Sequence, residues 1–422
     1  MPWLDRLVAG LLAPLAMWVL ASGLDDLFLD LCATYFGVSR WWRRRGRGLV
    51  RDGEGVIWPD HRPVERSIAL FIPAWREDAV IEKMLDHNIA AISYSNYQIF
   101  LGVYPNDMRT LSRVRASEAK YTRVHHVLCP HDGPTSKADC LNWVYRGMLC
   151  YEEQNGCRFE IVLHHDAEDV IHPKSLAWIS RYGQHYQMVQ MPVLPLPTPW
   201  WELTHGTYCD DFAQSSLRDL QVRQRLGGFL PSCGVGTAYQ RGALDRLAWN
   251  NGGDPFRAKS LTEDYEVGLE LDRLGNSQVL LDAKALGNHT LAATREYFPR
   301  QWRGAVRQRA RWVAGITLQS WQETGWNAGP GQLYWLWRDR KGLLNNPLTV
   351  AANLIFLYGL GQWCWARWTG NPWGLGQQLS ASPLVSWVLV VNVGLILIRL
   401  GVRAGYVRSA YGWKHARSPS RS

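Results

Sequence analysis

Residues 159–173 read FEIVLHHDAEDVIHP, in which a group of acidic residues follows an apolar run. The apolar run from Phe159 to His164 has the length and composition of a buried β-strand. Three carboxylates, Asp166, Glu168 and Asp169, follow it directly. Carboxylates at the carboxyl end of a strand can hold Mg²⁺ or Mn²⁺ together with substrate phosphates and waters. A short acidic cluster is more often a solvated turn, so its meaning depends on the rest of the chain.

Short β-rich runs alternate with helical patterns through the centre of the chain, about Asp52 to Asn345. Helical patterns at Glu77 to Ile92, Ser136 to Glu153 and Glu263 to Leu274 follow predicted strands. The other predicted strands are Ser67 to Ile72, Tyr97 to Val103, Arg123 to Leu128 and Gln278 to Leu281. The alternation predicts an α/β domain with a mainly parallel sheet, which binds its ligands beyond the carboxyl ends of the strands.

Three apolar stretches are long enough to cross a membrane. Leu7 to Leu24 contains no charged residue, and about 18 residues at about 1.5 Å rise nearly cross a hydrocarbon core of about 30 Å. A cleaved signal peptide is the alternative, but the arginine-rich block from Trp41 to Arg51 would be difficult to translocate. Two further spans are predicted at Pro347 to Trp365 and Pro383 to Ile398, joined by a short turn at Thr369 to Ser382.

The formal net charge of +9 fits nucleic acid, anionic lipid or a phosphate-bearing substrate as a partner. The arginine clusters lie beside the apolar stretches, which favours a membrane and argues against nucleic acid. The positive-inside rule then predicts an external N-terminus, a cytosolic C-terminus and a cytosolic central region. The eight cysteines show no CxxC pairing or zinc spacing, which indicates reduced thiols in a cytosolic setting.

Four regions follow from these patterns. Residues 1–51 hold the first span and a basic juxtamembrane segment, residues 52–296 the α/β domain, residues 297–345 amphipathic helices, and residues 346–422 two spans and a basic tail. The amphipathic helices mix Arg with Trp, Leu and Val, so they fit the headgroup plane of a bilayer. Ordinary surface helices packed on the domain are the alternative.

Three further segments carry candidate chemistry. The loop from Pro73 to Glu77 leaves the first strand where a nucleotide could settle, and Asp107 ends the second strand in the same manner. Thr262-Glu263-Asp264 begins a helix, where Thr262 could serve only as an N-cap and Asp264 as a partner of the helix dipole. The segment from Gln308 to Trp312 reads QRARW.

In this order and spacing, the motifs resemble those of family 2 inverting glycosyltransferases, which have the GT-A fold. The resemblance implies that Asp107 contacts the nucleotide base and that Asp166 and Glu168 hold the metal. It implies a general base at Asp264, with Glu263 beside it as the next candidate. One departure is that Glu168 stands where the family has Asp, so Asp169 competes for the second metal position.

The resemblance also divides the remaining residues between donor and acceptor. Lys137 opens a segment that resembles the family's K-A-x-x-L-N helix start and could approach a diphosphate, although a solvated lysine is the alternative. Gly234-Val235-Gly236-Thr237 resembles the acceptor-side loop and is not a dinucleotide fingerprint, because Tyr239 stands where the last Gly is needed. The implied donor residues are Glu77, Asp107, Lys137, Asp166, Arg309 and Arg311, and the implied acceptor residues are Gly234, Gly236, Thr237, Gln308 and Trp312.

The segment from Leu24 to Leu31 reads LDDLFLDL, and together with the one-span and two-span layout it resembles the phage-adsorption protein B branch of the family. Members often add a C-terminal domain that binds cyclic di-GMP, and the residues up to Ser422 leave no room for one, which puts that regulation in doubt.

The implied activity is hexosyl or N-acetylhexosaminyl transfer from a nucleotide-sugar, expected to be a UDP-sugar, to a glycan or lipid-linked acceptor. The resemblance places the enzyme in a bacterial inner membrane with a cytosolic catalytic domain, Mg²⁺ or Mn²⁺ as cofactor, and a role in cell-surface polysaccharide synthesis linked to phage adsorption. An outer-membrane export or phage-receptor protein is the expected partner. The alternatives are a nucleotidyltransferase, which would need an early glycine-rich phosphate loop, and a non-catalytic membrane scaffold.

Overall fold

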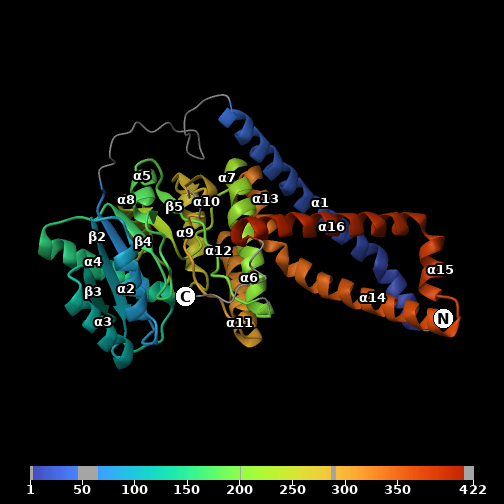
Figure 1. The fold of residues 1–422 in the computed structure, drawn as a ribbon, viewed down its shortest axis with the longest axis horizontal. Helices are drawn as coiled ribbons and strands as arrows, with labels where there is room; N and C mark the ends of the chain where they lie inside the picture. Colours follow the sequence, from blue (N-terminus) through green and yellow to red (C-terminus); the bar gives the residue numbers. More distant parts are fainter. Residues whose placement is uncertain (1–2, 46–64, 200, 287–290, 413–422) are drawn as a thin grey trace.

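The computed structural model describes residues 3–45, 65–199, 201–286 and 291–412. An α/β domain lies at one end, and four helices, α1, α14, α15 and α16, extend from it (Figure 1). Three of these four helices are long and apolar enough to cross a membrane: α1, α14 and α16. The predicted architecture, a mainly parallel sheet flanked by one apolar helix before it and two after it, is confirmed.

The sheet has seven strands in the order β3-β2-β1-β4-β6-β5-β7. All neighbouring strands are parallel except β6, which is antiparallel to both β4 and β5. The bounds are β1 Ile68–Pro73, β2 Tyr97–Val103, β3 Val124–Leu128, β4 Ile161–His164, β5 Met188–Gln190, β6 Thr237–Gln240 and β7 Gln278–Leu280. The five predicted strands are present within two residues at each end, whereas β5 and β6 were not predicted.

Helices cover both faces of the sheet, and the central strand β1 shows why. Leu70 and Ile72 belong to one hydrophobic core cluster, while Ala69 and Phe71 belong to a second one. A strand that is buried on both faces reads as a continuous apolar run, as β1 does. The helices of this domain are α2 Ile81–Ala91, α3 Met108–Lys120, α4 Lys137–Asn155, α5 Ser175–Tyr182, α6 Leu203–Gln214, π-helix η1 Ser215–Asp219, α7 Leu220–Arg225, α8 Arg241–Asn250, α9 Glu263–Arg273 and α10 Ala283–Leu286.

Helix α1 runs from Trp3 to Arg45, far beyond the predicted span Leu7 to Leu24. Its 43 residues correspond to roughly 65 Å, about twice the thickness of a hydrocarbon core. The start of α1 lies farthest from the sheet, and its second half reaches the α/β domain (Figure 1). There Leu29 is fully buried in a cluster with residues of α7, α9 and α13. The first helix therefore combines a segment that is apolar enough to cross a membrane with a stem that packs on the domain.

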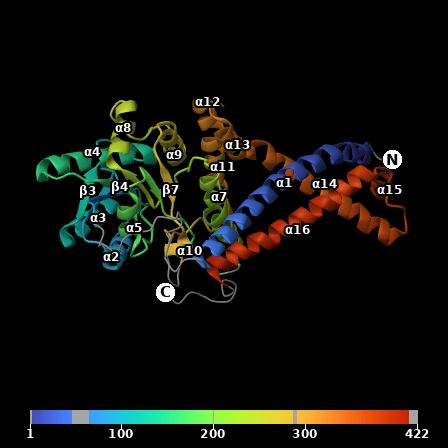
Figure 2. The ribbon, with the colours of Figure 1, turned by 90° about the horizontal axis from the view of Figure 1, so that it is seen from above.

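The two later spans are α14 Gly342–Thr369 and α16 Pro383–Tyr411. The predicted turn between them contains a short helix, α15 Gly374–Ala381, at the end that lies away from the sheet. Helix α16 packs side by side with α1 (Figure 2) and returns to the α/β domain, where the Tyr411 hydroxyl donates to the Pro195 carbonyl at 3.0 Å.

The region between the sheet and the second span is helical, as predicted, but its two parts differ. It comprises α11 Trp302–Val313, π-helix η2 Ala314–Gln319, α12 Ser320–Thr324 and α13 Pro330–Arg340. Trp302 and Val306 of α11 are exposed, as a face at a membrane surface would be. Trp335 and Leu336 of α13 are buried against the α1 stem. Helix α13 therefore serves largely as a packed element of the domain.

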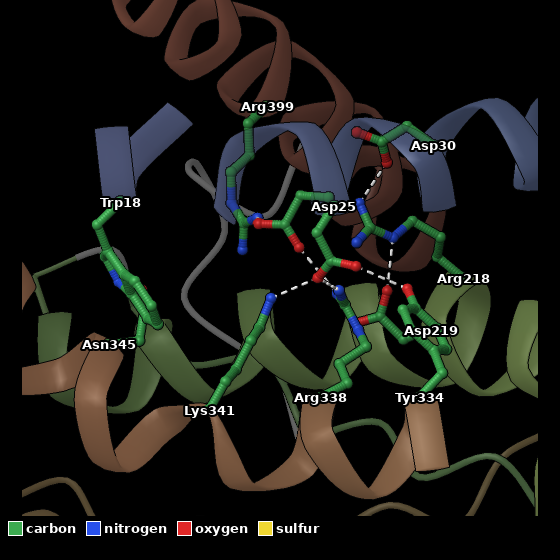
Figure 3. Close-up of polar contacts among 11 residues, drawn as sticks. Trp18, Asp25, Asp30, Arg218, Asp219, Tyr334, Arg338, Lys341, Asn345 and Arg399 are labelled. Carbon is green, nitrogen blue, oxygen red and sulfur yellow. Dashed lines mark hydrogen bonds and ion pairs between the residues drawn. The ribbon is translucent and has the colours of Figure 1, made fainter. Parts of the chain in front are cut away.

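Charged residues join α1 to the rest of the molecule (Figure 3). Asp25 accepts from the Tyr334 hydroxyl at 2.7 Å and the Lys341 ammonium at 2.5 Å, and it also pairs with Arg338. Asp26 pairs with Arg338 and with Arg399 of α16. These contacts give a structural role to the two adjacent aspartates of the LDDLFLDL segment, which link α1 to α13 and α16.

One turn further along α1, Asp30 pairs with Arg218 of η1. The Arg218 side chain is fully buried and also binds Asp219 at 2.6 Å. We call the contacts of Asp25, Asp26 and Asp30 the stem junction. Every carboxylate of this junction has a cationic partner.

Candidate active site

The three carboxylates of the acidic loop after β4, Asp166, Glu168 and Asp169, have different surroundings. Asp169 is fully buried, and its Oδ2 accepts from the Asp166 backbone N–H at 3.0 Å and lies 2.6 Å from Nδ1 of His165. These two contacts close the turn, so Asp169 maintains the shape of the acidic loop. Asp166 and Glu168 remain partly or largely accessible. The geometry thus favours Glu168 over Asp169 as the second candidate metal ligand.

Glu168 lies among other acids. Although its side chain has an open side, surrounding protein and the carboxylates of Asp166 and Glu77 raise the pKa of Glu168 to about 7. The pKa of Glu77 is likewise raised, by burial first and then by Asp166, Asp107 and Asp78. The exits of β1, β2 and β4 therefore place their acids close together.

The loop after β1 is held by Asp107, the N-cap of α3. One carboxylate oxygen accepts from the Thr110 N–H at 3.3 Å, and the other accepts from the Arg76 N–H at 2.6 Å. Arg76 has a φ of 59°, a left-handed conformation that is uncommon for a residue with a side chain. Such local strain is typical of ligand-binding loops. Asp107 thus shapes the loop that precedes Glu77. If Asp107 also contacts a nucleotide base, as the resemblance implies, it must do so while it keeps these two backbone hydrogen bonds.

Lys137, the first residue of α4, connects the metal motif to the glycine-rich loop. Its ammonium lies 2.5 Å from Oδ1 of Asp166 and donates to the Gly234 carbonyl at 3.3 Å. Burial lowers the pKa of Lys137, but Asp166, Glu263 and Asp264 outweigh it and keep the pKa above its usual range. Lys137 is therefore a charged residue at the centre of the acidic site, and the alternative of a solvated lysine does not hold.

Glu263 and Asp264 begin α9 beside the same lysine. Burial, and then the Asp264 charge, raise the pKa of Glu263 to about 7. The pKa of Asp264 is also raised, chiefly by burial, while Lys137 and Arg311 oppose the shift. Thr262 occupies the N-cap position but makes no side-chain capping bond. The alternative role of Thr262 is therefore confirmed for its N-cap position, although its hydroxyl makes no capping bond.

The glycine-rich loop lies directly on Asp264. A Cβ added at Gly234 would approach Asp264 Oδ2 to 2.7 Å, and the φ of 75° also disfavours any side chain. Gly236, with φ 60°, lies against the Thr294 hydroxyl in the same way. Thr237 is fully buried, and its hydroxyl donates to Gln190 at 2.6 Å. The loop therefore can place backbone near an acceptor, but the predicted acceptor contact by the Thr237 side chain is not available.

The two arginines of the QRARW segment lie in different surroundings. Arg311 donates to the Leu261 carbonyl at 2.9 Å. It also lies close enough to Asp264 to oppose the rise in the pKa of that carboxyl. Arg309 instead binds Asp211 of α6 at 2.7 Å and lies 4.6 Å above the ring of Tyr208. The structure thus brings Arg311, and not Arg309, to the acidic site. Helix α11 turns them to different sides because they are two residues apart.

The other two residues of the segment are less free than predicted. Trp312 packs among the rings of Tyr208, Phe212 and Phe298 with one part exposed. Oε1 of Gln308 is buried and has no hydrogen-bond partner among the described residues. Trp312 can therefore present only part of its ring to a sugar, whereas Gln308 retains an acceptor atom that a ligand hydroxyl could satisfy.

Glu296 was missed from the sequence. It is 8% exposed, and burial and the charges of Asp169, Asp166 and Glu168 raise its pKa well above the usual range. The adjacent Arg295 forms an isolated antiparallel bridge with Val170, which brings this segment beside the acidic loop. No local motif surrounds Glu296, so only the tertiary bridge reveals it as a site residue.

A divalent cation fits this site by its chemistry. Among the residues that the structure describes, no preformed group of three metal-ligating side chains exists. However, Mg²⁺ and Mn²⁺ are commonly bound by one or two carboxylates together with substrate phosphates and waters. Burial, and after it the neighbouring carboxylates, raise the pKa values of Glu168, Glu77 and Glu296, and a bound cation would offset the negative charge of these acids. Asp166 and Glu168 could hold it.

Comparisons with known proteins agree with the fold. Residues 65–315 match the family described as Glycosyltransferase like family 2. Bacteriophage adsorption protein B of Escherichia coli K12 and Bacteriophage N4 adsorption protein B of Escherichia coli O157:H7 are each 34% identical to this chain over 416 residues, which cover 94% of it. The chain spans 55% of the length of these relatives.

The mannosyltransferase PcManGT from Pyrobaculum calidifontis, solved with GDP-Man and Mn²⁺, has a similar structure with a TM-score of 0.52. The likeness covers 97% of this chain and all of that one, and the sequences are 16% identical, so it concerns the fold alone. The family match covers more than half of the chain and includes the acidic loop, the start of α9 and the QRARW segment. The chain belongs to the glycosyltransferase family 2.

Proposed function

We propose that the chain is a membrane-bound, inverting glycosyltransferase that transfers a hexosyl or N-acetylhexosaminyl group from a nucleotide-sugar, expected to be a UDP-sugar, to a glycan or lipid-linked acceptor. The observation that carries the proposal is the position of Asp264. Its carboxylate lies against Gly234, and the Lys137 ammonium that contacts Asp166 also bonds to Gly234. A candidate base and a candidate diphosphate site thus share one glycine loop.

Asp264 is suited to remove a proton from an acceptor hydroxyl. Its raised pKa makes it a stronger base than an exposed aspartate. As the acceptor oxygen bonds to the anomeric carbon, the proton passes to the Asp264 carboxylate and the bond from that carbon to the diphosphate oxygen breaks. Attack opposite the leaving group inverts the anomeric configuration. Glu263 lies next to Asp264 and has a pKa of about 7, so its protonation state sets the charge beside the base.

Lys137 and Arg311 supply the positive charge on the donor side. The Lys137 ammonium is fixed at the centre of the acids and can move its contact from Asp166 to a diphosphate oxygen. Arg311 can bind two phosphate oxygens at once through its planar guanidinium. Asp166 and Glu168 would hold Mg²⁺ or Mn²⁺, which when bound offsets the charge of the leaving diphosphate.

The same proposal includes the membrane orientation. The start of α1 and the helix α15 lie at the far end of the spans, and the α/β domain lies at the other end with Arg399 and Arg403 of α16. The positive-inside rule then places the domain in the cytosol, where nucleotide-sugars are available, and the spans in a bacterial inner membrane. The names of the relatives support a link to phage adsorption. The proposal also includes an outer-membrane export or phage-receptor protein as the partner.

The test is a nucleotide-sugar panel on membranes that contain the full chain, scored for release of nucleoside diphosphate with Mn²⁺, with Mg²⁺ and with a chelator. We expect one nucleotide-sugar to be turned over and the chelator to stop the reaction. Absence of turnover with every donor, despite correctly folded protein, would contradict the proposal and favour a non-catalytic scaffold.

A further inference from the structure

Helix α1 exposes an apolar stripe along its second half, the stem that reaches the α/β domain. The stripe consists of hydrophobic side chains with exposed fractions between 46% and 69%, namely Leu24, Phe28, Leu31, Tyr35, Val38 and Trp42. We call these six residues the stem seam. The intervals between them are alternately four and three residues. A contiguous apolar stripe of this kind on a protein surface usually marks a site of interaction.

The spacing of the stem seam is that of a coiled-coil heptad. Apolar residues at heptad positions a and d repeat every 3.5 residues on average and form the line along which two helices pack. The three aromatic residues of the stem seam occupy position a, and Leu24, Leu31 and Val38 occupy position d. A helix face that met only water would carry polar or charged residues at these positions. The pattern therefore fits a second helix.

The charged residues between Leu24 and Trp42 lie off the stem seam. They are Asp25, Asp26 and Asp30 of the stem junction, and Arg40, which pairs with Asp282. Each of them has a partner of opposite charge within the same chain. Packing a helix along the stem seam would therefore leave no charge buried without a partner.

A bilayer around the candidate spans would not cover the stem seam. Asp26 pairs with Arg399 of α16, so charged residues of both helices mark the inner end of the spans. From Phe28 to Trp42 the helix extends roughly 21 Å further, whereas the headgroup region is only roughly 5–8 Å thick on each side of a bilayer. Because α1 is one uninterrupted helix, this part continues away from the spans to the α/β domain (Figure 1). In a single copy, most of the stem seam would face water.

The exposed area of the stem seam suffices for a dimer. With about 150–250 Å² for each aromatic side chain, the observed exposed fractions correspond to roughly 700 Å² per copy for the six residues. Stable protein interfaces bury roughly 600–1,000 Å² on each partner. Two stems packed along this line therefore reach the area that a specific dimer needs.

The same heptad positions continue into the apolar half of α1. They are Gly10, Pro14, Met17 and Ala21, and all four are exposed. A Cβ added at Gly10 would meet nothing within 4 Å. Small residues on one face of a membrane-spanning helix allow another helix to approach closely. The line of contact that begins in the stem can therefore extend along most of α1.

We propose that two copies of this chain form a dimer through a parallel coiled coil of their α1 stems. The two copies enter the membrane in the same orientation, so the stems run parallel and the two-fold axis lies along the membrane normal. Each residue of the stem seam then meets the same residue of the second copy. Because Leu29 holds each stem to its own domain, the two α/β domains lie on either side of the paired stems. The proposal goes beyond the proposed function and does not depend on it.

Cysteine cross-linking in native membranes tests which residues meet. The full chain is used with serine at its exposed cysteines, Cys150, Cys157 and Cys364. Leu31→Cys and Val38→Cys each place a thiol on the stem seam. Gly37→Cys is the matched control, because Gly37 is exposed beside Val38, lies off positions a and d, and has open space where a Cβ would lie. After mild oxidation, we expect at least fivefold more covalent dimer for the two seam variants than for the control.

A charge on the stem seam tests the same dimer without cross-linking. Tyr35→Glu would bring two like charges together, whereas Gly37→Glu carries the same charge off the seam. The mass of the protein in lipid nanodiscs should be that of two copies for wild type and Gly37→Glu, and the dimer fraction should fall at least fivefold in Tyr35→Glu. Tyr35 is 69% exposed, so thermal unfolding of the two variants should agree.

Several results would overturn the proposal. They are equal cross-linking of Gly37→Cys and the seam variants, no covalent dimer in either seam variant, a wild-type mass of one copy, and a dimer that Tyr35→Glu leaves intact. A stem that lay on the bilayer or bound a different protein would give no covalent dimer in either seam variant.

Discussion

The acidic site and the stem junction are both clusters of buried or half-buried charge, but they are balanced differently. In the stem junction, Asp25, Asp26 and Asp30 each contact an arginine or lysine. In the acidic site, burial and then neighbouring carboxylates raise the pKa values of Glu77, Glu168 and Glu296. Paired charges fix the packing of helices, whereas unbalanced charges need a ligand. The contrast supports the end of β4 as the proposed catalytic site.

The largest expected effect concerns Asp166. Asp166→Asn removes a carboxylate that contacts Lys137 and is placed to hold the cation, so turnover should fall by about 10³-fold or more, roughly 4 kcal/mol of barrier. Asp169→Asn, which alters the turn and not the ligand set, is the matched comparison and should retain more activity. The measurement is nucleoside diphosphate release across a Mn²⁺ titration. Full activity of Asp166→Asn in chelator would contradict the metal assignment.

The stem junction should respond in stability. Asp30→Ala leaves the fully buried Arg218 without one of its two carboxylates, which should cost about 3–5 kcal/mol. Asp30→Leu combined with Arg218→Met should recover much of the loss, because an apolar pair of similar volume needs no ion pairing. Thermal unfolding in detergent measures both. A double variant no more stable than Asp30→Ala would show that the charges themselves are required.

Glu266 lies one turn along α9 from Glu263. It tests how the burial of an acid alone affects the stability of the fold. Burial raises the pKa of Glu266 to about 7 from an ordinary value of 4.5. Because the folded-state pKa is the higher one, this carboxyl's contribution to stability is present below about pH 4.5 and is lost as the pH rises through about 7. Glu266→Gln should therefore stabilise the fold at pH 8 by up to about 3 kcal/mol and have little effect at pH 4. Unfolding midpoints at the two pH values check it, and a constant difference between them would contradict it.

The smallest expected effect distinguishes two arginines of one motif. Arg311→Ala should lower turnover by about 10-fold, roughly 1.4 kcal/mol, because its guanidinium lies near Asp264. Arg309→Ala should stay within about threefold, because its partners are Asp211 and Tyr208. Steady-state rates at saturating donor measure the pair. A larger loss for Arg309→Ala would reverse the assignment.

Local sequence patterns predicted the strands that matter most for the site. An apolar run followed by acids needs only the preference of strands for buried, β-branched residues. Strands β5 and β6 have three and four residues and gain their pairing from neighbours far away in the chain, so no local pattern indicated them. The length of α1 was underestimated because its polar second half packs on the domain, and hydropathy does not register such packing.

The site residues follow the same division. Asp166, Lys137 and Asp264 occupy the start of helices or the end of a strand, where spacing indicates position. Glu296 reaches the site only through the bridge between Val170 and Arg295. Arg309 and Thr237 lie within recognisable motifs, but tertiary partners occupy them. A motif thus predicts which segment is at the site and does not predict which of its side chains remain free.

Asp264→Asn, with turnover and donor affinity measured on the same sample, tests whether Asp264 is the general base. The amide keeps the shape of the side chain and cannot accept the proton, so turnover should fall by about 10²–10⁴-fold, roughly 3–5 kcal/mol. Donor affinity should stay within a few-fold, because Lys137, Asp166 and Arg311 remain in place. Turnover within a few-fold of wild type would contradict the account and direct attention to Glu263.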